Sequence, residues 1–212
     1  MPLAVSQVIL SEFQSNCYVV RADDSATRAA IVDPGGEPSA LLAELARAGI
    51  ETSAILITHT DIDHVDGVAA LAAATGAEVW APAGEVDALR RGETRTGRPF
   101  PAHAPEHEVR GGDRLEVAGI PFEVIDVPGH SAGHVAFATG DSIFSGDLLF
   151  AGSVGRVDLP GGDWDTLLGS VRRLVDRFGA DGVVYPGHGP KTTLGQELGT
   201  NPFLGELRAA AR

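Results

Sequence analysis

The segment LITHTDIDHVDG, residues 56–67, concentrates side chains that can bind a metal ion. Two histidines and three aspartates lie within the eight positions from His59 to Asp66. They follow the apolar run SAILIT, residues 53–58, which is typical of a strand buried on both faces. Charged groups at such a position are costly unless they are paired. Because imidazole nitrogens and carboxylate oxygens bind divalent metals, the segment indicates a metal site.

Three more groups of the same kind follow other predicted strands. His130 comes after FEVIDV, Asp147 after SIFSG and His188 after GVVYP. Strands that lie side by side bring their carboxyl ends together, and binding sites collect there. Two metal ions about 3.5–4 Å apart would activate a water molecule and polarise a carbonyl or phosphoryl oxygen. The alternative is that these are loop residues and helix caps, with Asp63 or Asp66 capping the next helix, but it does not explain the whole set.

The elements that must position these groups alternate along the chain. Apolar runs and turn residues predict strands over 16–22, 29–36, 53–58, 77–81, 113–119, 121–129, 134–140, 141–147 and 181–187. Helical spacing of apolar residues predicts helices over 38–49, 67–76, 163–179 and 201–211. Two packed sheets with helices on their outer faces would bury these strands.

The length favours a single domain over 1–212, built from two similar halves, roughly 1–112 and 113–212. The stretch 91–113 is polar and rich in Pro and Gly, so we expect an exposed excursion or a boundary between the halves. The only cysteine, Cys17, lies inside a predicted strand and is expected to be a buried small hydrophobe.

Composition narrows the class of protein. The formal net charge of −13 disfavours partners such as nucleic acids and anionic membranes, which bind clustered Lys and Arg. The first ten residues have no basic region and only a short apolar run, so neither a signal peptide nor a membrane span is expected. We therefore expect a cytoplasmic protein that acts on a small molecule. The oligomeric state is not predicted.

The chemistry-bearing residues resemble the pattern of the metallo-β-lactamase superfamily. Its leading motif is His-x-His-x-Asp-His after a strand, followed by a lone His, a bridging Asp and a final His; SNCYVV and IVDPGG also resemble its opening strands. The resemblance implies an α/β fold, an αββα sandwich of two mixed β-sheets with helices on the outer faces. The implied ligands are His59, Asp61 and His130 for one ion, Asp63, His64 and His188 for the other, and Asp147 between the two.

Other phrases resemble the compact form of the glyoxalase II group, the hydroxyacylglutathione hydrolases. They are PGHSAGHVAF, FSGDLLFAGSVGRVDLPGGD and YPGHGPKTTLGQELGTNPFL. The C-terminal helical domain of longer members is expected to be absent. The resemblance implies a metallo-hydrolase that cleaves a hydroxyacyl thioester with a metal-bound hydroxide, with Asp63 orienting the attacking water. Arg156 or Lys191 could attract a substrate carboxylate, although surface solvation is the simpler role for each.

Asp61 departs from the pattern, because the family has His at this position. The extra carboxylate would make the inner shell of two divalent ions, three aspartates and a hydroxide neutral, and it favours Fe or Mn over the otherwise expected Zn. We hypothesise that Asp61 binds the first ion directly. The alternatives are a site with one dominant ion and a weakened or repurposed enzyme.

Three other functions stay open at this point. One is cleavage of a lactone or another ester. A second is sulfur oxidation, since iron-dependent persulfide dioxygenases resemble the same group. The third, a metal-binding protein with a decayed site, is disfavoured because six of the seven ligand positions match the family pattern.

Overall fold

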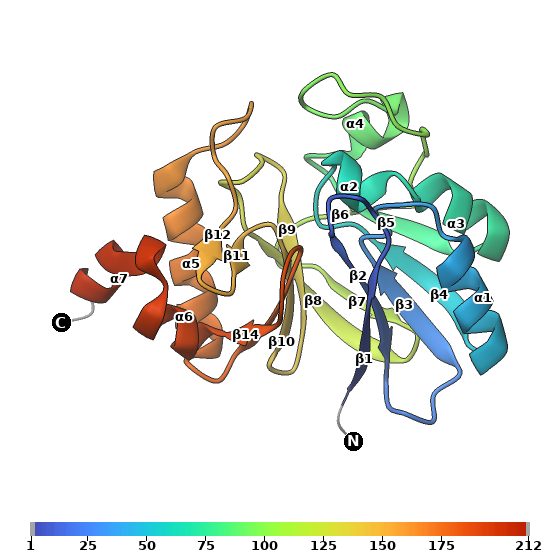
Figure 1. Cartoon of the computed structure of the whole chain (residues 1–212), viewed down its shortest axis with the longest axis horizontal. Helices are drawn as coiled ribbons and strands as arrows, with labels where there is room; N and C mark the ends of the chain where they lie inside the picture. The colour runs from blue at the N-terminus through green and yellow to red at the C-terminus, as the bar shows by residue number, and fades with distance from the viewer. Residues whose placement is uncertain (1–2, 211–212) are drawn as a thin grey trace.

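The computed structural model describes residues 3–210, and its strands form two mixed six-stranded sheets that face each other (Figure 1). The first sheet has the order β1-β2-β3-β4-β5-β6. Its strands are β1 (Ala4–Ile9), β2 (Asn16–Arg21), β3 (Arg28–Val32), β4 (Glu51–Leu56), β5 (Glu78–Pro82) and β6 (His107–Val109). The pairs from β3 to β6 are parallel, and the two preceding pairs are antiparallel.

The second sheet has the order β14-β13-β10-β9-β8-β7. Its strands are β7 (Arg114–Val117), β8 (Ile120–Asp126), β9 (Val135–Thr139), β10 (Ser142–Gly146), β13 (Val183–Pro186) and β14 (Thr192–Thr193). Only the β10–β13 pair is parallel. The short strands β11 (Leu149–Phe150) and β12 (Ser153–Val154) pair with each other.

Helices cover the outer faces of both sheets (Figure 1). They are α1 (Ser39–Ala48), α2 (Ile62–Val65), α3 (Val68–Thr75), α4 (Val86–Arg91), α5 (Trp164–Phe178), α6 (Leu194–Thr200) and α7 (Gly205–Ala210), with a 3₁₀ turn η1 (Pro202–Leu204) before the last. The longest, α5, begins with the Asp163 side chain accepting a hydrogen bond from the Thr166 backbone N–H at 2.8 Å, which is a standard N-cap. Between residues 3 and 210, no helix combines the length and apolar character needed to cross a membrane.

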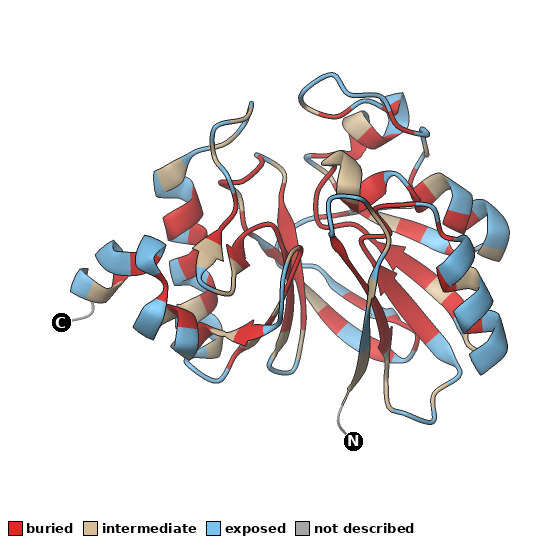
Figure 2. Cartoon of the chain, viewed as in Figure 1, coloured by how far each residue is buried: buried red, intermediate tan, exposed pale blue. Residues whose placement is uncertain are grey.

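Three apolar layers hold these elements together. Along β2, Tyr18 and Val20 point between the two sheets, whereas Cys17 and Val19 point toward the helices of the first half. On the other side, Ile143 of β10 packs with the buried face of α5. Figure 2 shows the same pattern, with buried residues along the strands and exposed residues on the outward faces of the helices. The predicted αββα sandwich is therefore confirmed.

Most predicted elements are present, with some corrections. The stretch 91–113 is not simply exposed: Thr94, Phe100 and Val109 are buried, and its last part contains β6. Strand β1 and helices α2, α4 and α6 lie outside the predicted elements because each is short or only weakly patterned. The predicted helix 201–211 is instead η1 followed by α7, and position 211 lies outside the described residues. The description of the whole chain as one domain with halves 1–112 and 113–212 stays a prediction.

Candidate metal centre

The seven candidate ligands lie together, each just beyond the carboxyl end of a strand. The segment that begins at His59 follows β4, His130 follows β8, Asp147 follows β10, and His188 follows β13. The two sheets meet here, because the N–H of Val135 donates to the carbonyl oxygen of Thr58 at 3.0 Å. Four of the seven candidate ligands therefore follow a strand of the first sheet, and three follow strands of the second.

The first donor set consists of His59, Asp61 and His130. Oδ2 of Asp61 lies 3.0 Å from Nε2 of His130 and 3.9 Å from Nε2 of His59. These three ligand atoms lie within 4.8 Å of one another, which suits binding to a single ion. Asp61 stands at the N-cap of α2, but its side chain makes no capping bond and is free to face the site.

The second donor set consists of Asp63, His64 and His188. Oδ2 of Asp63 lies 3.1 Å from Nε2 of His188 and 3.8 Å from Nε2 of His64. This set also lies within 4.8 Å. Neither Asp63 nor Asp66 caps α3, which begins after Gly67 without a side-chain cap, so the capping alternative is wrong.

Asp147 lies between the two sets. Its Oδ1 is 3.3 Å from Nε2 of His64, and its Oδ2 is 3.5 Å from Nε2 of His188 and 3.9 Å from Nε2 of His130. Gly146 allows this approach: it has φ +48°, and a Cβ there would lie 2.4 Å from Oγ1 of Thr58. Asp147 can therefore contribute a carboxylate oxygen to both sets.

Hydrogen bonds to the outer nitrogen of three histidines leave Nε2 facing the site. Nδ1 of His59 lies 3.0 Å from Oγ1 of Thr58, and Nδ1 of His64 lies 3.0 Å from Oδ2 of Asp33. Nδ1 of His130 donates to the carbonyl oxygen of Arg156 at 2.8 Å. Such contacts fix the tautomer and the ring orientation of metal-binding histidines.

Asp33 supports both histidines of the segment after β4. Its Oδ1 accepts the backbone N–H of Thr58 at 2.8 Å, and its Oδ2 accepts the Thr58 hydroxyl at 2.7 Å. The Thr58 hydroxyl, having donated to Asp33, is left to accept from His59. Asp33 has φ +51°, a left-handed conformation that is costly for most residues and that collects at functional sites.

Several buried polar atoms that face the centre have no partner among the described residues. They are Nε2 of His59, Nε2 of His64 and Oδ1 of Asp147. A buried polar atom without a hydrogen bond costs about 1–3 kcal/mol, so three in one place need an explanation. Imidazole nitrogens and carboxylate oxygens are the atoms that divalent ions bind, and the residues present therefore fit a two-metal centre.

The charges of the site favour ionised aspartates. Burial by itself would raise the pKa of the Asp147 carboxyl, but the charges of His64 and a hydrogen bond with His188 hold it well below its usual range. Burial lowers the pKa of His59 far below the ordinary value, and the neighbouring histidines lower it further. His59 is therefore neutral at pH 7, as a metal ligand must be.

Arg95 belongs to the centre although it lies in the stretch that was expected to be exposed. Its Nε donates to Oδ1 of Asp61 at 2.9 Å and its Nη2 to Oδ2 at 2.7 Å. Burial by itself would raise the pKa of the Asp61 carboxyl, but contacts with His130 and Arg95 outweigh it and hold that pKa well below its usual range. The Asp61 carboxylate is therefore ionised and paired with a guanidinium group.

Two more buried carboxylates tie the loops around the centre. Glu85 accepts hydrogen bonds from the hydroxyls of Thr60 and Ser131, at 2.5 and 2.6 Å, and so joins the loop after β4 to the loop after β8. Glu197 accepts the Thr192 hydroxyl at 2.5 Å and the Gly152 N–H at 2.8 Å. Neither residue could be singled out by pattern, because a surface glutamate has the same local sequence.

A pocket of about 370 Å³ opens onto the centre. Asp61, Asp63, His130, Asp147 and His188 form its floor. Its walls include Phe13 and Leu159, which are apolar, together with Thr94, Thr96, Arg98 and Arg156. The guanidinium of Arg98 lies over the Phe13 ring, 5.1 Å from the ring centre. The pocket thus combines an anionic floor with an apolar and basic rim.

The other candidate residues lie either in the pocket or away from it. Arg156 lines the pocket and is paired with Asp158 at 2.7 Å, whereas Lys191 is exposed and does not line it. His107 is also outside the site, because it stacks on Trp80 with ring centres 3.8 Å apart. Cys17 is buried in β2 as predicted, and burial raises the pKa of its thiol.

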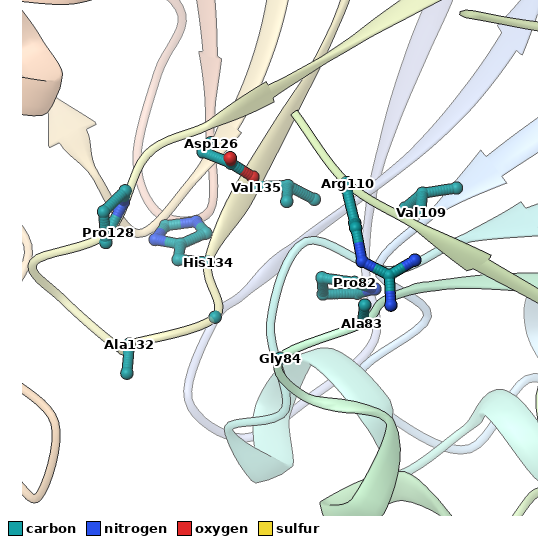
Figure 3. Close-up of a pocket in the computed structure, with 11 residues that line it drawn as sticks. Pro82, Ala83, Gly84, Val109, Arg110, Asp126, Pro128, Ala132, His134 and Val135 are labelled. Carbon is teal, nitrogen blue, oxygen red and sulfur yellow. The ribbon is translucent and has the colours of Figure 1, made fainter. Parts of the chain in front are cut away.

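A second pocket of about 290 Å³ is lined in part by His134 (Figure 3). His134, Asp126 and Pro128 line one side of it, and Arg110 lies opposite. The His134 ring packs 4.8 Å from the His59 ring, and within residues 3–210 neither of its nitrogens has a hydrogen-bond partner. His134 therefore backs the first donor set without joining it.

Comparison with known proteins agrees with this arrangement. The model of the Metallo-beta-lactamase superfamily matches residues 10–188. Hydroxyacylglutathione hydrolase GloC of Haemophilus influenzae is 35% identical over 204 residues, which cover 92% of this chain and 95% of that protein. The structure of BLEG-1 B3 metallo-beta-lactamase is 36% identical, with a TM-score of 0.88 and coverage of 95% of this chain and 100% of that chain. The structure of TTHA1623 in a di-iron-bound form is 42% identical, with a TM-score of 0.83 and coverage of 94% and 100%.

Proposed function

Because the chain belongs to the metallo-beta-lactamase superfamily, a family of metallo-hydrolases, we propose that it hydrolyses a thioester of the hydroxyacyl–thiol kind. The proposal includes the ligand assignment: the first donor set holds one divalent ion, the second donor set holds another, and Asp147 contributes to both. Zinc is the expected ion, with iron or manganese as alternatives. The relative named hydroxyacylglutathione hydrolase supports the choice of substrate class.

The observation that carries the proposal is the arrangement of the two donor sets around Asp147. Asp147 lies within 3.3 Å of His64 and 3.5 Å of His188, so its carboxylate could contribute to both ions in an open pocket. Two divalent ions held there would supply a Lewis acid for the thioester carbonyl and lower the pKa of a water molecule, so that it serves as the nucleophile.

Asp63 is the residue expected to act on that water. Burial by itself would raise the pKa of its carboxyl, but hydrogen bonding with His188 and the charge of His64 outweigh it and lower the pKa below its ordinary value. An ionised carboxylate in the pocket floor can accept a hydrogen bond from water and orient it toward a bound carbonyl. A C–O bond then forms, the C–S bond breaks, and the thiolate leaves.

The rim of the pocket suits an anionic thiol carrier. Arg98 and Arg156 lie beside the apolar side chains of Phe13 and Leu159. A small hydroxyacyl group fits the floor, while carboxylates of the thiol part face the two guanidinium groups. This local basic rim is consistent with a strongly acidic chain, since steering depends on the charge near the mouth.

The test is turnover of a panel of substrates by protein of known metal content, followed as thiol release for the thioester, ring opening for the lactone and the β-lactam, and oxygen uptake for the persulfide. The panel contains a hydroxyacyl thioester of glutathione, a lactone, glutathione persulfide and a β-lactam. We expect thioester cleavage that falls by more than about 100-fold in His188→Ala, since changes to mere supporting contacts of a metal site already cost up to that factor. His103→Ala is the matched control, because His103 lies outside both donor sets and contacts Glu106.

The same panel of substrates would also detect a reaction other than thioester hydrolysis. Oxygen uptake with the persulfide and no thiol release from the thioester would refute the proposal, as would faster cleavage of the lactone or the β-lactam. A His188→Ala variant that keeps full thioester cleavage would refute the assignment of the ligands.

A further inference from the structure

Arg95 is the one Arg or Lys side chain, within residues 3–210, that forms an ion pair with a candidate ligand. It lies after α4, and its guanidinium donates two N–H···O bonds of 2.9 and 2.7 Å to the Asp61 carboxylate. Paired bonds of this kind are strong and directional. Arg95 therefore has a fixed position beside the first donor set.

Every N–H of the Arg95 guanidinium has an acceptor. Besides the two bonds to Asp61, Nη2 lies 3.0 Å from Nε2 of His130. Nη1 donates to the carbonyl oxygen of His130 and, at 3.3 Å, to that of Pro160. A guanidinium has five N–H donors, so none remains for a substrate. Its role must concern the donor set itself.

The contact with His130 brings the guanidinium into competition with a metal ion. Nδ1 of His130 donates its hydrogen to the carbonyl oxygen of Arg156, so Nε2 carries the single lone pair of the ring. Oδ2 of Asp61 lies 3.0 Å from the same nitrogen. Nη2 of Arg95 contacts both.

We propose that Arg95 is a resident cation of the first donor set, so that a metal ion binds there more weakly than at the second donor set. An ion at the first set must take the His130 lone pair from Arg95 and lie beside a positive charge. The second set has no such neighbour: among the described residues its members form ion pairs with one another, with Asp33 and with Asp147, but with no Arg or Lys.

The same pair also balances the unusual charge of Asp61. An aspartate in place of histidine adds one negative charge to the centre, and the adjacent guanidinium adds one positive charge. The pair is therefore neutral, as a histidine would be, but its positive half competes for the first ion. The proposal rests on the ligand assignment in the proposed function and not on the thioesterase activity.

A purely supporting role for Arg95 is also testable, because it predicts the opposite change in the affinity of the first donor set for its ion. If Arg95 only held Asp61 in place as a ligand, its removal would loosen the first ion. If Arg95 competes with that ion, its removal tightens it. Replacement by methionine removes the charge while keeping an unbranched apolar chain of similar reach.

The experiment is a titration of the metal-free protein with Zn²⁺ against a chromophoric chelator, which gives two stepwise dissociation constants. We expect one tight ion and a second bound at least about 10-fold more weakly in the unmodified chain, on the scale by which contacts to ligands change metal affinity. In Arg95→Met the second step should tighten by about 10- to 100-fold. In His188→Ala the tight step should disappear, which assigns it to the second donor set.

Two control variants show whether the change in zinc affinity comes from the charge of Arg95. Arg95→Lys retains one positive charge, so its second step should stay within about threefold of the unmodified chain, well inside the change expected for charge removal. Arg91→Met removes the same charge from an exposed position at the end of α4 and should leave both steps unchanged. Circular dichroism and thermal unfolding verify that each variant is folded.

Two results would overturn the proposal: equal affinities for both ions in the unmodified chain, or a weaker second step in Arg95→Met. Either result leaves the proposed function intact if the thioester is cleaved. Conversely, the two zinc dissociation constants could differ as expected and the weaker one could tighten in Arg95→Met, while the thioester is not cleaved. That result would refute the proposed function and support the role of Arg95.

Discussion

Replacing Asp33 by asparagine tests how the second donor set is built. Asp33 is buried and accepts three hydrogen bonds: the Thr58 N–H at 2.8 Å, the Thr58 hydroxyl at 2.7 Å and Nδ1 of His64 at 3.0 Å. Asparagine has nearly the same shape and tolerates the left-handed backbone at φ +51°. The substitution therefore changes the hydrogen-bonding chemistry and leaves the fold of the turn intact.

The expected effect follows from counting acceptors. An asparagine side chain offers one acceptor oxygen where the carboxylate offers two. If that oxygen keeps the Thr58 N–H, the amide NH₂ faces the N–H at Nδ1 of His64, and the ring must move its proton to Nε2. An ion then finds no lone pair on Nε2 of His64, and metal binding at the second donor set weakens.

Two independent magnitudes for the loss of zinc affinity in Asp33→Asn agree. Loss of a contact that orients a metal-binding histidine lowers affinity by about 10- to 100-fold, or about 1.4–2.8 kcal/mol. A hydrogen bond to a charged group contributes about 1.5–3 kcal/mol. We therefore expect the tight zinc step of Asp33→Asn to weaken by about 10- to 100-fold.

The assay is the chelator-competition titration with zinc, combined with urea unfolding of the metal-free chain. Asp66→Asn makes the same chemical change at an exposed position next to α2 and should leave zinc binding unaltered. If Asp33→Asn bound both ions as tightly as the unmodified chain, Asp33 would not set the proton position of His64, and the reasoning about the supporting contacts would be wrong.

Three further predictions follow from the same contacts. Glu85→Ala removes the acceptor shared by the Thr60 and Ser131 hydroxyls and should lower the free energy of unfolding by about 3–5 kcal/mol in urea titrations, against about 0.5 kcal/mol or less for the exposed Glu44→Ala. Burial lowers the pKa of His134 from 6.5 to about 3, and the charge of His130 contributes to the same shift. Between pH 6.5 and pH 3 the unfolded chain therefore binds more protons than the folded chain. The free energy of unfolding of the metal-free protein should then fall as the pH falls. His134→Leu should make the free energy of unfolding less dependent on pH between 6 and 4.5, by up to about 1.4 kcal/mol per pH unit, and an unchanged slope would contradict this. Zinc at 100 times its dissociation constant should stabilise the chelator-treated protein by about 2.7 kcal/mol and raise Tm by about 5–11 °C, measured by thermal unfolding, whereas an unchanged Tm would mean that the native state binds no zinc.

The sequence predicted the architecture well because most elements are long and strongly patterned. The continuous apolar run over 53–58 matched β4, and helical spacing of apolar residues matched α1 and α5. The elements outside the prediction are short or amphiphilic: β1 alternates weakly between half-buried and exposed residues, and α2 has one turn. Their structure comes from neighbours in space, which a local pattern does not contain.

The candidate ligands were predictable because their residue types are rare at the ends of buried strands. Arg95 was not, because it lies in a polar, Pro- and Gly-rich stretch where an arginine ordinarily points to water. The available signal was indirect: an aspartate at position 61 adds a charge that some cation has to balance. Which of the 16 Lys and Arg residues does so depends on how the loop after α4 folds back over the site.

The division of the ligands between the two sheets has a consequence for how the protein is made. His64 and His188 are 124 positions apart in the chain. At about 5–20 residues per second, a ribosome needs about 6 to 25 s to travel that distance. During this interval the nascent chain carries the imidazole and carboxylate groups of one half, while the second donor set lacks its last member. If the donor sets hold ions as proposed, the second donor set would therefore be complete only after translation of the second sheet, and an ion that arrives earlier would meet an incomplete site.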